Sequence, residues 1–265
     1  MEIMNAVIVV AVGIAIFIVM GLLNKHNQNY YKLIAFDLDG TLIDSSKDLA
    51  AAINATLDKN GFTQIDEKEV IPLLGNGTKR LISDVLPENT SDEMKEKCYK
   101  EFLEYYKEHD AEKTITYPGI KVLLGYLKNK KHYKLAVITN KDDDIAKDII
   151  NKLLPGKFDF VIGSNTGLRN KPAPDAMTYL SQKMKVKSHL IVYVGDSEVD
   201  YQFAMNSNVN VIMASWGYRD KDYLRQLGNR VNIIDNRVNY TIYFNFQIFT
   251  KYSDKKVRLC HRIKK

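Results

Sequence analysis

Cysteine and histidine are scarce in this chain of 265 residues. The two cysteines, Cys98 and Cys260, lie far apart and form no CxxC pair, and the five histidines are scattered along the sequence. A disulfide framework or a zinc site needs such residues in greater number or at short, fixed spacings. The sequence therefore predicts neither, and it contains no internal repeat and no low-complexity stretch.

Most of the chain also lacks an excess of positive charge, although the formal net charge is +6. Residues 237–265 hold eight Lys or Arg residues and one acidic residue, so the remainder carries a net charge of −1. A nucleic-acid-binding domain usually carries a basic patch, and no such partner is predicted here. The same tail contains an aromatic stretch at 241–249 whose period near two suits a strand.

One long run, residues 6–23, lacks charged and strongly polar side chains. Its 18 residues just reach the length of a transmembrane helix. Glu2 precedes the run where a signal peptide would carry basic residues, so we expect an uncleaved membrane anchor at residues 1–29. Lys25 and Lys32 follow the run, and the positive-inside rule then predicts a single-pass protein whose main domain is cytoplasmic. A signal peptide or a misassigned start codon is the alternative.

The most informative segment is DLDGT at residues 37–41. It follows Leu33–Phe36, an apolar stretch that reads as a buried parallel strand. Asp37 and Asp39 lie two residues apart and can therefore share a face, and Gly40 permits a sharp turn. Two carboxylates this close repel each other unless a cation offsets the charge, and an all-oxygen site favours Mg²⁺. The alternative is a turn with two solvated aspartates.

Strands alternate with helices along the rest of the chain, which predicts an α/β fold with a doubly wound, Rossmann-like parallel sheet. Further core strands are expected at 134–138, 160–162, 190–194 and 211–214. Ligands of such sheets bind beyond the carboxyl ends of the strands. The polar residues expected there are Asp37, Asp39, Thr139 and Asp196.

Between the first two core strands the pattern is helical. Ser45 and Ser46 can begin a helix that ends at Asn60-Gly61. Amphipathic patterns at 78–85 and 93–106 predict two more helices. No convincing strand occurs before about residue 112, so we expect a helical insert in the sheet domain.

Four segments, in order, resemble the motifs of the haloacid dehalogenase (HAD) superfamily of phosphatases. DLDGT matches the first, LAVITN at 135–140 the second, NKPAPD at 170–175 the third, and VGDSEVD at 194–200 the fourth. The resemblance implies a catalytic core formed by residues 30–46 and 117–236. It also implies a helical C1-type cap at 47–116, with the 237–265 tail atypical of the family.

The resemblance also implies a role for each motif residue. Asp37 would be the nucleophile, and Asp39 would protonate the leaving oxygen and later deprotonate water. The metal would be held by Asp37, the backbone carbonyl of Asp39, and Asp196, with Asp200 behind them or orienting Lys171. Phosphate would be bound by Thr139, Asn140 and the catalytic Lys171. Dehalogenases lack an acid at the position of Asp39, so its presence favours phosphoryl transfer.

Substrate choice is expected to lie in the cap. The segment 74–82 resembles the G-x-G loop of phosphoglycolate phosphatases, as do 117–119 and 215–218, and the whole resemblance covers residues 31–235. The cap residues expected to select the substrate are Gly75, Asn76, Gly77, Lys79 and Arg80. The two cations could pair with a carboxylate, although they could equally be ordinary surface charges.

These motifs favour a Mg²⁺-dependent hydrolase that converts 2-phosphoglycolate to glycolate and phosphate through an aspartyl-phosphate. A pyrophosphatase and a sugar-phosphate phosphatase or mutase remain alternatives on the same scaffold, and a non-catalytic membrane-tethered adaptor is the alternative from another class. The chain departs from the subfamily in its apolar run, in its tail, and at Asn206-Ser207-Asn208, where a glycine is usual.

Overall fold

The computed structural model describes residues 31–129, 133–228 and 231–235. The predicted membrane span at 6–23 and the tail at 237–265 lie outside these ranges. Within the ranges, no helix combines the length and the apolar character that crossing a membrane requires.

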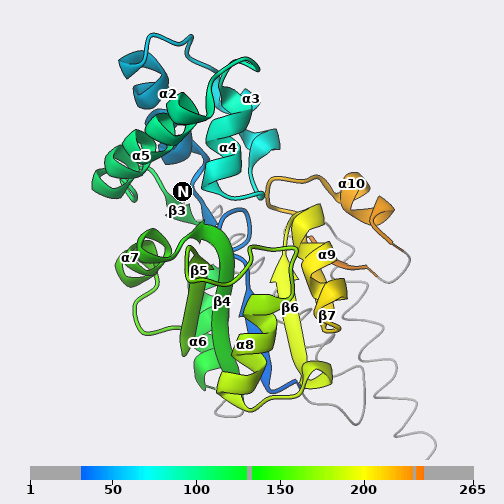
Figure 1. Cartoon of the computed structure of the whole chain (residues 1–265). Coiled ribbons are helices and arrows are strands. Elements are labelled where there is room, and N and C mark those ends of the chain that lie inside the picture. Colours follow the sequence, from blue (N-terminus) through cyan, green and yellow to red (C-terminus); the bar gives the residue numbers. More distant parts are fainter. Residues whose placement is uncertain (1–30, 130–132, 229–230, 236–265) are drawn as a thin grey trace, which may run out of the picture.

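A six-stranded parallel sheet forms the centre of the molecule (Figure 1), which confirms the predicted sheet. Its strands lie in the order β5-β4-β1-β6-β7-β8, so the order reverses at β1. The strand bounds are β1 Leu33–Phe36, β4 Lys134–Asp142, β5 Phe160–Ser164, β6 Ile191–Gly195, β7 Asn210–Ala214 and β8 Asn232–Ile234. The sequence predicted β1 to the residue and the next four strands with shorter or slightly shifted bounds.

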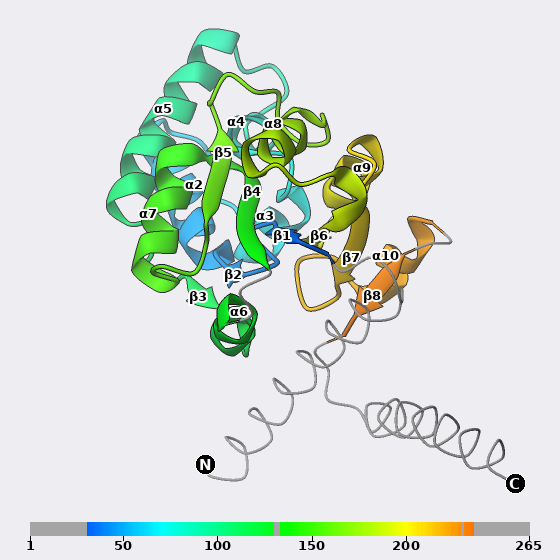
Figure 2. The same cartoon turned by 90° about the horizontal axis from the view of Figure 1, so that it is seen from below.

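Helices cover both faces of this sheet (Figure 2). On one face lie α6 (Ile120–Asn129) and α7 (Asp143–Leu153), and on the other α8 (Asp175–Met184), α9 (Glu198–Asn206) and α10 (Lys221–Gln226). Alternate residues of β1 pack into the two separate cores. This double burial explains why the strands read as unbroken apolar runs.

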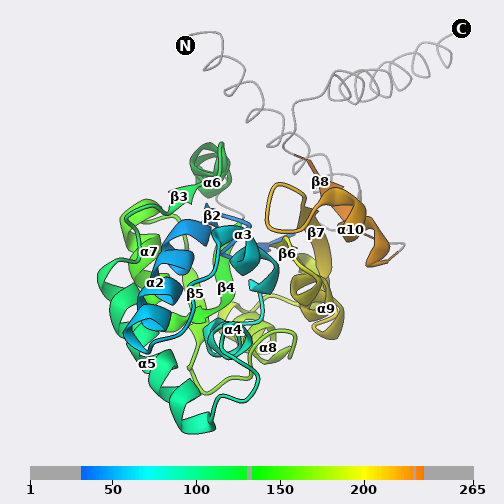
Figure 3. The same cartoon turned by 90° about the horizontal axis from the view of Figure 1, so that it is seen from above.

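The predicted helical insert is present and lies over the carboxyl ends of the strands (Figure 3). It contains α2 (Ser46–Lys59), α3 (Glu67–Val70), α4 (Thr78–Val85) and α5 (Asp92–Glu108), with a short 3-10 turn at Ile71–Leu73. The apolar side chains of α2 and α5 are buried in the same core as α6 and α7. Packing of amphipathic faces therefore holds the insert together and joins it to the sheet domain.

Two short strands connect the insert to the core. β2 (Ile43–Asp44) pairs with β3 (Ile115–Thr116) in antiparallel register, so the outgoing and returning chains run side by side. The Asp48 carboxylate, near the start of α2, accepts hydrogen bonds from the backbone N–H groups of Lys113 and Thr114. These strands were not predicted, because two residues are too few to show a periodic pattern.

The departures near the end of the domain do not disturb the sheet. Asn208 adopts the left-handed conformation, with φ of 52°, that favours glycine and that asparagine also tolerates. β8 completes the sheet beside β7, and Ile234 is 1% exposed. A 3-10 turn at Ser188–Leu190 leads into β6.

Candidate active site

The site lies where the strand order reverses, at the carboxyl end of β1. Asp37 is the first residue after the strand and is 5% exposed, and its N–H donates to the Val194 carbonyl at 2.8 Å. Gly40 turns the chain with φ of +80°, and a Cβ there would lie 2.2 Å from Oδ2 of Asp196. Glycine therefore allows the first motif to approach the fourth.

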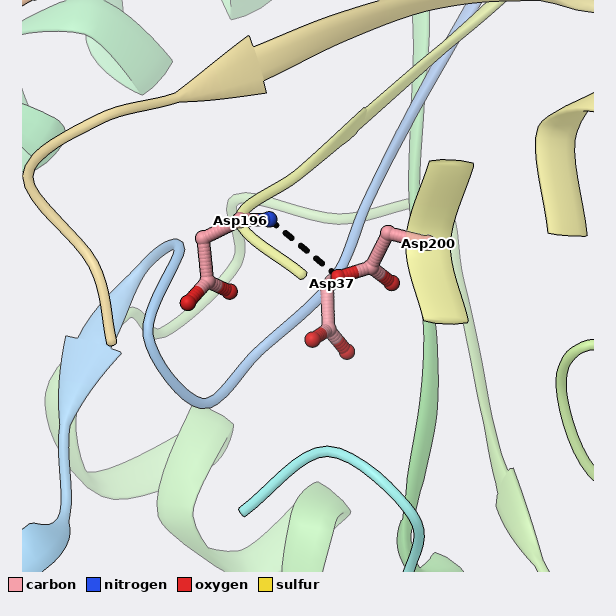
Figure 4. Close-up of side chains that lie close together, drawn as sticks. All are labelled: Asp37, Asp196 and Asp200. Atoms are coloured by element: carbon pink, nitrogen blue, oxygen red, sulfur yellow. Dashed lines mark hydrogen bonds between the residues drawn. The ribbon is translucent and has the colours of Figure 1, made fainter. Parts of the chain in front are cut away.

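Three carboxylates gather in this crevice (Figure 4). Asp37, Asp196 and Asp200 each offer an oxygen, and these oxygens lie within 4.8 Å of one another. Asp196 follows β6 and is 1% exposed, while Asp200 comes from the first turn of α9 and is fully buried. Three negative charges in so dry a place require compensation.

Burial and mutual repulsion change the acidity of two of them. Burial, followed by repulsion from Asp200, raises the pKa of Asp37 to about 7. The pKa of Asp196 is also well above its ordinary value, first because of burial and then because of Asp200 and Asp37. Without a cation, these carboxylates therefore tend to keep protons that a metal ion would displace.

Asp200 differs from the other two because its oxygens are already used. Oδ1 accepts from Lys171 at 2.7 Å and lies 3.1 Å from the Tyr193 hydroxyl, whose single hydrogen is shared with the Ile138 carbonyl at 2.9 Å. Oδ2 accepts from the N–H groups of Asp196 and Ser197 and from the Ser197 hydroxyl. Burial would raise the pKa of Asp200, but Lys171 and Ser197 outweigh it and lower this pKa. With four N–H or O–H donors on its two oxygens, Asp200 is less suited to hold a metal directly than Asp37 and Asp196 are.

The remaining oxygens suit a hard divalent cation. Oδ1 of Asp37 is buried, and the ammonium of Lys171 lies 2.8 Å from it as an ion pair. Asp196 accepts one hydrogen bond from Thr41 at 3.0 Å and one from the Tyr218 N–H at 2.8 Å, one on each oxygen. Three carboxylates beside the single ammonium of Lys171 leave an excess of negative charge, and such an all-oxygen donor set fits Mg²⁺.

Lys171 lies beside the cluster. Its ammonium contacts Asp37, Asp200 and the Tyr193 hydroxyl at 2.8, 2.7 and 2.9 Å, and its side chain is 3% exposed. Burial alone would lower the pKa of Lys171, but Asp200 and Asp37 outweigh it and raise this pKa. The lysine therefore stays charged next to the candidate nucleophile.

The second motif contributes Asn140, which holds the backbone around Lys171, and the hydroxyl group of Thr139. The Asn140 side chain accepts from the Lys171 N–H at 2.8 Å and donates to the carbonyls of Lys171 and Gly75 at 3.0 and 3.1 Å. Both of its amide hydrogens are thus used within the protein. Thr139 lines a small cavity together with Asp37 and Asp39, and its hydroxyl accepts from the Lys141 N–H at 3.2 Å.

Asp39 contacts a residue that the sequence analysis missed. Lys141, near the end of β4, places its ammonium 3.1 and 3.2 Å from the two oxygens of Asp39. The Ser45 hydroxyl donates to the same carboxylate, although the sequence suggested a helix-capping role for Ser45. Lys141 directly follows the second motif, so its position in the sequence was a usable signal.

The expected cap residues divide into two groups. Gly75 and Gly77 line a small cavity of about 40 Å³ together with Asp37 and Asp39. Lys79 and Arg80 instead are 71% and 68% exposed and pair with carboxylates of the insert, Glu96 and Asp84 respectively. With Asn76, these two cations line a different hollow.

A loop after β7, residues 215–219, braces both sides of the site. The Trp216 indole N–H donates to the Thr41 carbonyl at 3.1 Å. The Tyr218 hydroxyl accepts from the Ser45 N–H at 3.1 Å. Arg219 pairs with Glu198 and donates to the Pro72 and Leu74 carbonyls of the insert. The loop therefore ties the acidic cluster to the insert.

Comparison with known proteins agrees with this geometry. A family model described as haloacid dehalogenase-like hydrolase matches residues 34–214. The chain therefore belongs to the haloacid dehalogenase-like hydrolase family. This confirms the resemblance seen in the sequence and the expectation of an enzyme, and it does not support the non-catalytic adaptor.

Several relatives are phosphatases. The chain is 34% identical over 188 residues to a phosphoglycolate phosphatase of Aquifex aeolicus, covering 71% of this chain and 86% of the relative. It is 31% identical over 203 residues to that of Chromobacterium violaceum, covering 75% and 91%. A crystal structure from Lactobacillus delbrueckii subsp. bulgaricus, provisionally described as a phosphoglycolate phosphatase, superposes with a TM-score of 0.72 at 31% identity and covers 77% and 94%.

Proposed function

We propose that this chain is a Mg²⁺-dependent phosphomonoester hydrolase that works through an aspartyl-phosphate on Asp37. The observation that carries the proposal is the surroundings of Asp37: a buried carboxylate with Lys171 at 2.8 Å and two further buried acids. Asp39 follows two residues later in a less buried position, with its side chain 19% exposed.

The reaction would proceed in two steps. A carboxylate oxygen of Asp37 forms a bond to phosphorus while the ester P–O bond breaks, and Asp39 gives its proton to the leaving oxygen. Water then attacks the same phosphorus, Asp39 takes the proton of the water, and Asp37 is released with inorganic phosphate. Lys171 and the Thr139 hydroxyl stabilise charge on the phosphoryl oxygens.

The metal would be held by Asp37, Asp196 and the carbonyl of Asp39. When bound, Mg²⁺ supplies positive charge that offsets the carboxylates and the phosphate dianion. Asp200 would remain behind these ligands, where it orients Lys171.

The substrate is proposed to be 2-phosphoglycolate, which yields glycolate and phosphate. The names of the relatives support this choice. A substrate panel on the purified protein tests the choice. It contains 2-phosphoglycolate, pyrophosphate, hexose phosphates and p-nitrophenyl phosphate, each with and without Mg²⁺. A higher kcat/KM for pyrophosphate or a hexose phosphate would replace the proposed substrate.

The helical insert is proposed to act as a C1-type cap. Gly75 and Gly77 of the insert line the cavity beside Asp37 and Asp39, so movement of the insert would change access to the proposed nucleophile. The paired strands β2 and β3 provide a natural hinge. We also propose that residues 1–29 anchor the enzyme to a membrane with its domain in the cytoplasm.

A further inference from the structure

The cavity beside Asp37 and Asp39 contains a cation that no motif accounts for. Of the described residues that line it, Lys141 is the one cationic side chain. Its side chain is 3% exposed, so desolvation costs it heavily unless anionic groups surround it. Both oxygens of the Asp39 carboxylate lie within 3.2 Å of the ammonium, so one anionic partner is in place.

The second partner of Lys141 comes from the insert. The ammonium lies 4.6 Å from the centre of the Tyr106 ring, on α5. Tyr106 is 1% exposed, and the ammonium of Lys141 acts on its buried hydroxyl through charge and a side-chain hydrogen bond. Lys141 therefore links the first motif, through Asp39, to the insert, through Tyr106. The ammonium and the hydroxyl together form a place where an anionic acceptor would be stabilised.

The position of Lys141 relative to Asp39 identifies which part of a substrate would reach it. Asp39 is the proposed proton donor to the leaving oxygen, so that oxygen must come within hydrogen-bond distance of its carboxyl group. Lys141 Nζ lies 3.1 Å from the same carboxyl group. The group attached next to the leaving oxygen therefore falls beside Lys141, and in a phosphoglycolate the carboxylate is two bonds from that oxygen.

We infer that Lys141, assisted by Tyr106, determines specificity by binding a carboxylate on the leaving group of the substrate. This inference rests on the proposed phosphomonoester hydrolysis and specifies its substrate class: short phosphate esters whose leaving alcohol carries a carboxylate next to the ester carbon. Lys79 and Arg80 are less suited to this task, because both are exposed and paired outside the cavity.

The test compares two substrates that differ in the carboxylate alone: 2-phosphoglycolate and ethyl phosphate. Lys141→Met should lower kcat/KM for 2-phosphoglycolate about ten- to a hundredfold more than for ethyl phosphate, the range expected for one charge-assisted hydrogen bond. Lys141→Arg should recover part of this preference, because it keeps the charge. Tyr106→Phe should reduce the preference by a smaller factor.

Two further variants serve as controls. The double variant Lys79→Met/Arg80→Met removes the competing cations, and Lys147→Met removes a lysine whose side chain is 50% exposed on α7 and pairs with Asp143. Both should keep the preference for 2-phosphoglycolate. Thermal unfolding of each variant checks the fold, and the charge-retaining Lys141→Arg and Tyr106→Phe variants carry the test if Lys141→Met does not fold.

The inference is overturned by equal losses on both substrates, which would mean that Lys141 serves Asp39 alone. A loss of preference in the Lys79/Arg80 variant but not at Lys141 would overturn it too. Failure of the proposed substrate is a separate result, seen as a wild type that does not favour 2-phosphoglycolate. The same variants are then compared on 2-phosphoglycerate and glycerol 2-phosphate, and a wild type that favours neither 2-phosphoglycolate nor 2-phosphoglycerate over its matched ester would refute the inference.

Discussion

The acidic cluster of the sheet domain and helix α4 of the insert hold their charged side chains in opposite ways. Around Asp37, the charged groups of Lys171 and Asp200 are less than a tenth exposed, and each has fixed partners within 3 Å. On the insert, Lys79 and Arg80 are largely exposed and pair with neighbours on helices α5 and α4. The comparison teaches that chemistry is concentrated at the strand ends, where dehydration strengthens every charge interaction.

The sharpest test of this comparison is Asp37→Asn. The substitution keeps the shape of the side chain but removes the proposed nucleophile, so kcat should fall by several orders of magnitude. Because it also removes one of three mutually repelling carboxylates, the melting temperature should not fall. Steady-state kinetics with p-nitrophenyl phosphate and 2-phosphoglycolate measure the loss. The matched control is Asp222→Asn, at a side chain 83% exposed on α10, which should keep activity. Asp37→Asn activity within tenfold of wild type would contradict the assignment.

Metal removal is expected to have the next largest effect. EDTA should stop turnover and added Mg²⁺ should restore it, because the buried carboxylates otherwise repel one another and the substrate phosphate. Binding can be followed separately through the fluorescence of Trp216, the one tryptophan of the chain, whose indole bonds to Thr41. Thr41 in turn bonds to Asp196, so the indole is connected to the metal cluster. Full activity in metal-free buffer would refute the proposal.

The same difference between the two regions decides what the sequence could predict. Asp37 and Asp196 directly follow strands, and Thr139 lies in the last part of β4. Parallel strands bring their carboxyl ends to one edge of the sheet, so these residues, distant in the chain, lie close together as predicted. The directions of Lys79 and Arg80 depend on how α4 packs against α5. Local sequence patterns do not encode that helix packing. In the structure, the packing leaves the side chains of Lys79 and Arg80 exposed to solvent.

The contact of Lys141 with Asp39 was not predicted from the sequence, for a related reason. The apolar pattern that predicts a strand ends before Thr139-Asn140. In the structure, β4 continues to Asp142, where its register with β5 is irregular. That extension, together with the first motif, brings the lysine to Asp39. β2 and β3 likewise exist because of the pairing between them, and neither has a pattern of its own.

The buried charges of the acidic cluster should also make the stability of the fold depend on pH. The pKa of Asp37 is about 7 in the folded protein and near 3.8 when exposed, chiefly because of burial and then Asp200. Between about pH 4 and 7 the folded state keeps a proton that the unfolded state releases, so the free energy of unfolding falls as pH rises. The melting temperature of chelated protein should therefore fall across this window.

Added Mg²⁺ should reverse that loss, with a larger stabilisation at pH 8 than at pH 5. Calorimetry of chelated and Mg²⁺-loaded protein at both values measures the difference. The Asp37→Asn variant isolates the contribution of this residue from those of other titrating groups. Equal stabilisation by Mg²⁺ at both pH values would show that protons and metal do not compete at this cluster.

A smaller effect is expected where the insert meets the core. The Tyr99 hydroxyl on α5 donates to Asp142 at 2.9 Å and accepts from Asn165 at 3.2 Å. Tyr99→Phe removes these bonds and should weaken closure by about 1 kcal/mol, which is about fivefold in kcat/KM. Tyr105→Phe on the same helix is the matched control, since its ring packs against His109. Equal kcat/KM values for the two variants would argue that the hydrogen bond between Tyr99 and Asp142 does not stabilise the closed position of the insert.

The smallest expected effect on catalysis comes from removing the ends of the chain, because every proposed catalytic group lies between Asp37 and Asp200. Deleting residues 1–29 should release an active enzyme from the membrane fraction, since the 6–23 run is the proposed anchor. Deleting 237–265 should leave the protein in that fraction. Each cation of this tail would contribute about 1 kcal/mol at an anionic membrane surface, and salt screens that attraction. Both truncations should keep kcat near the wild-type value. Fractionation in low and high salt decides between the two ends: an N-terminal truncation that stays with the membrane in high salt would show that the anchor lies elsewhere.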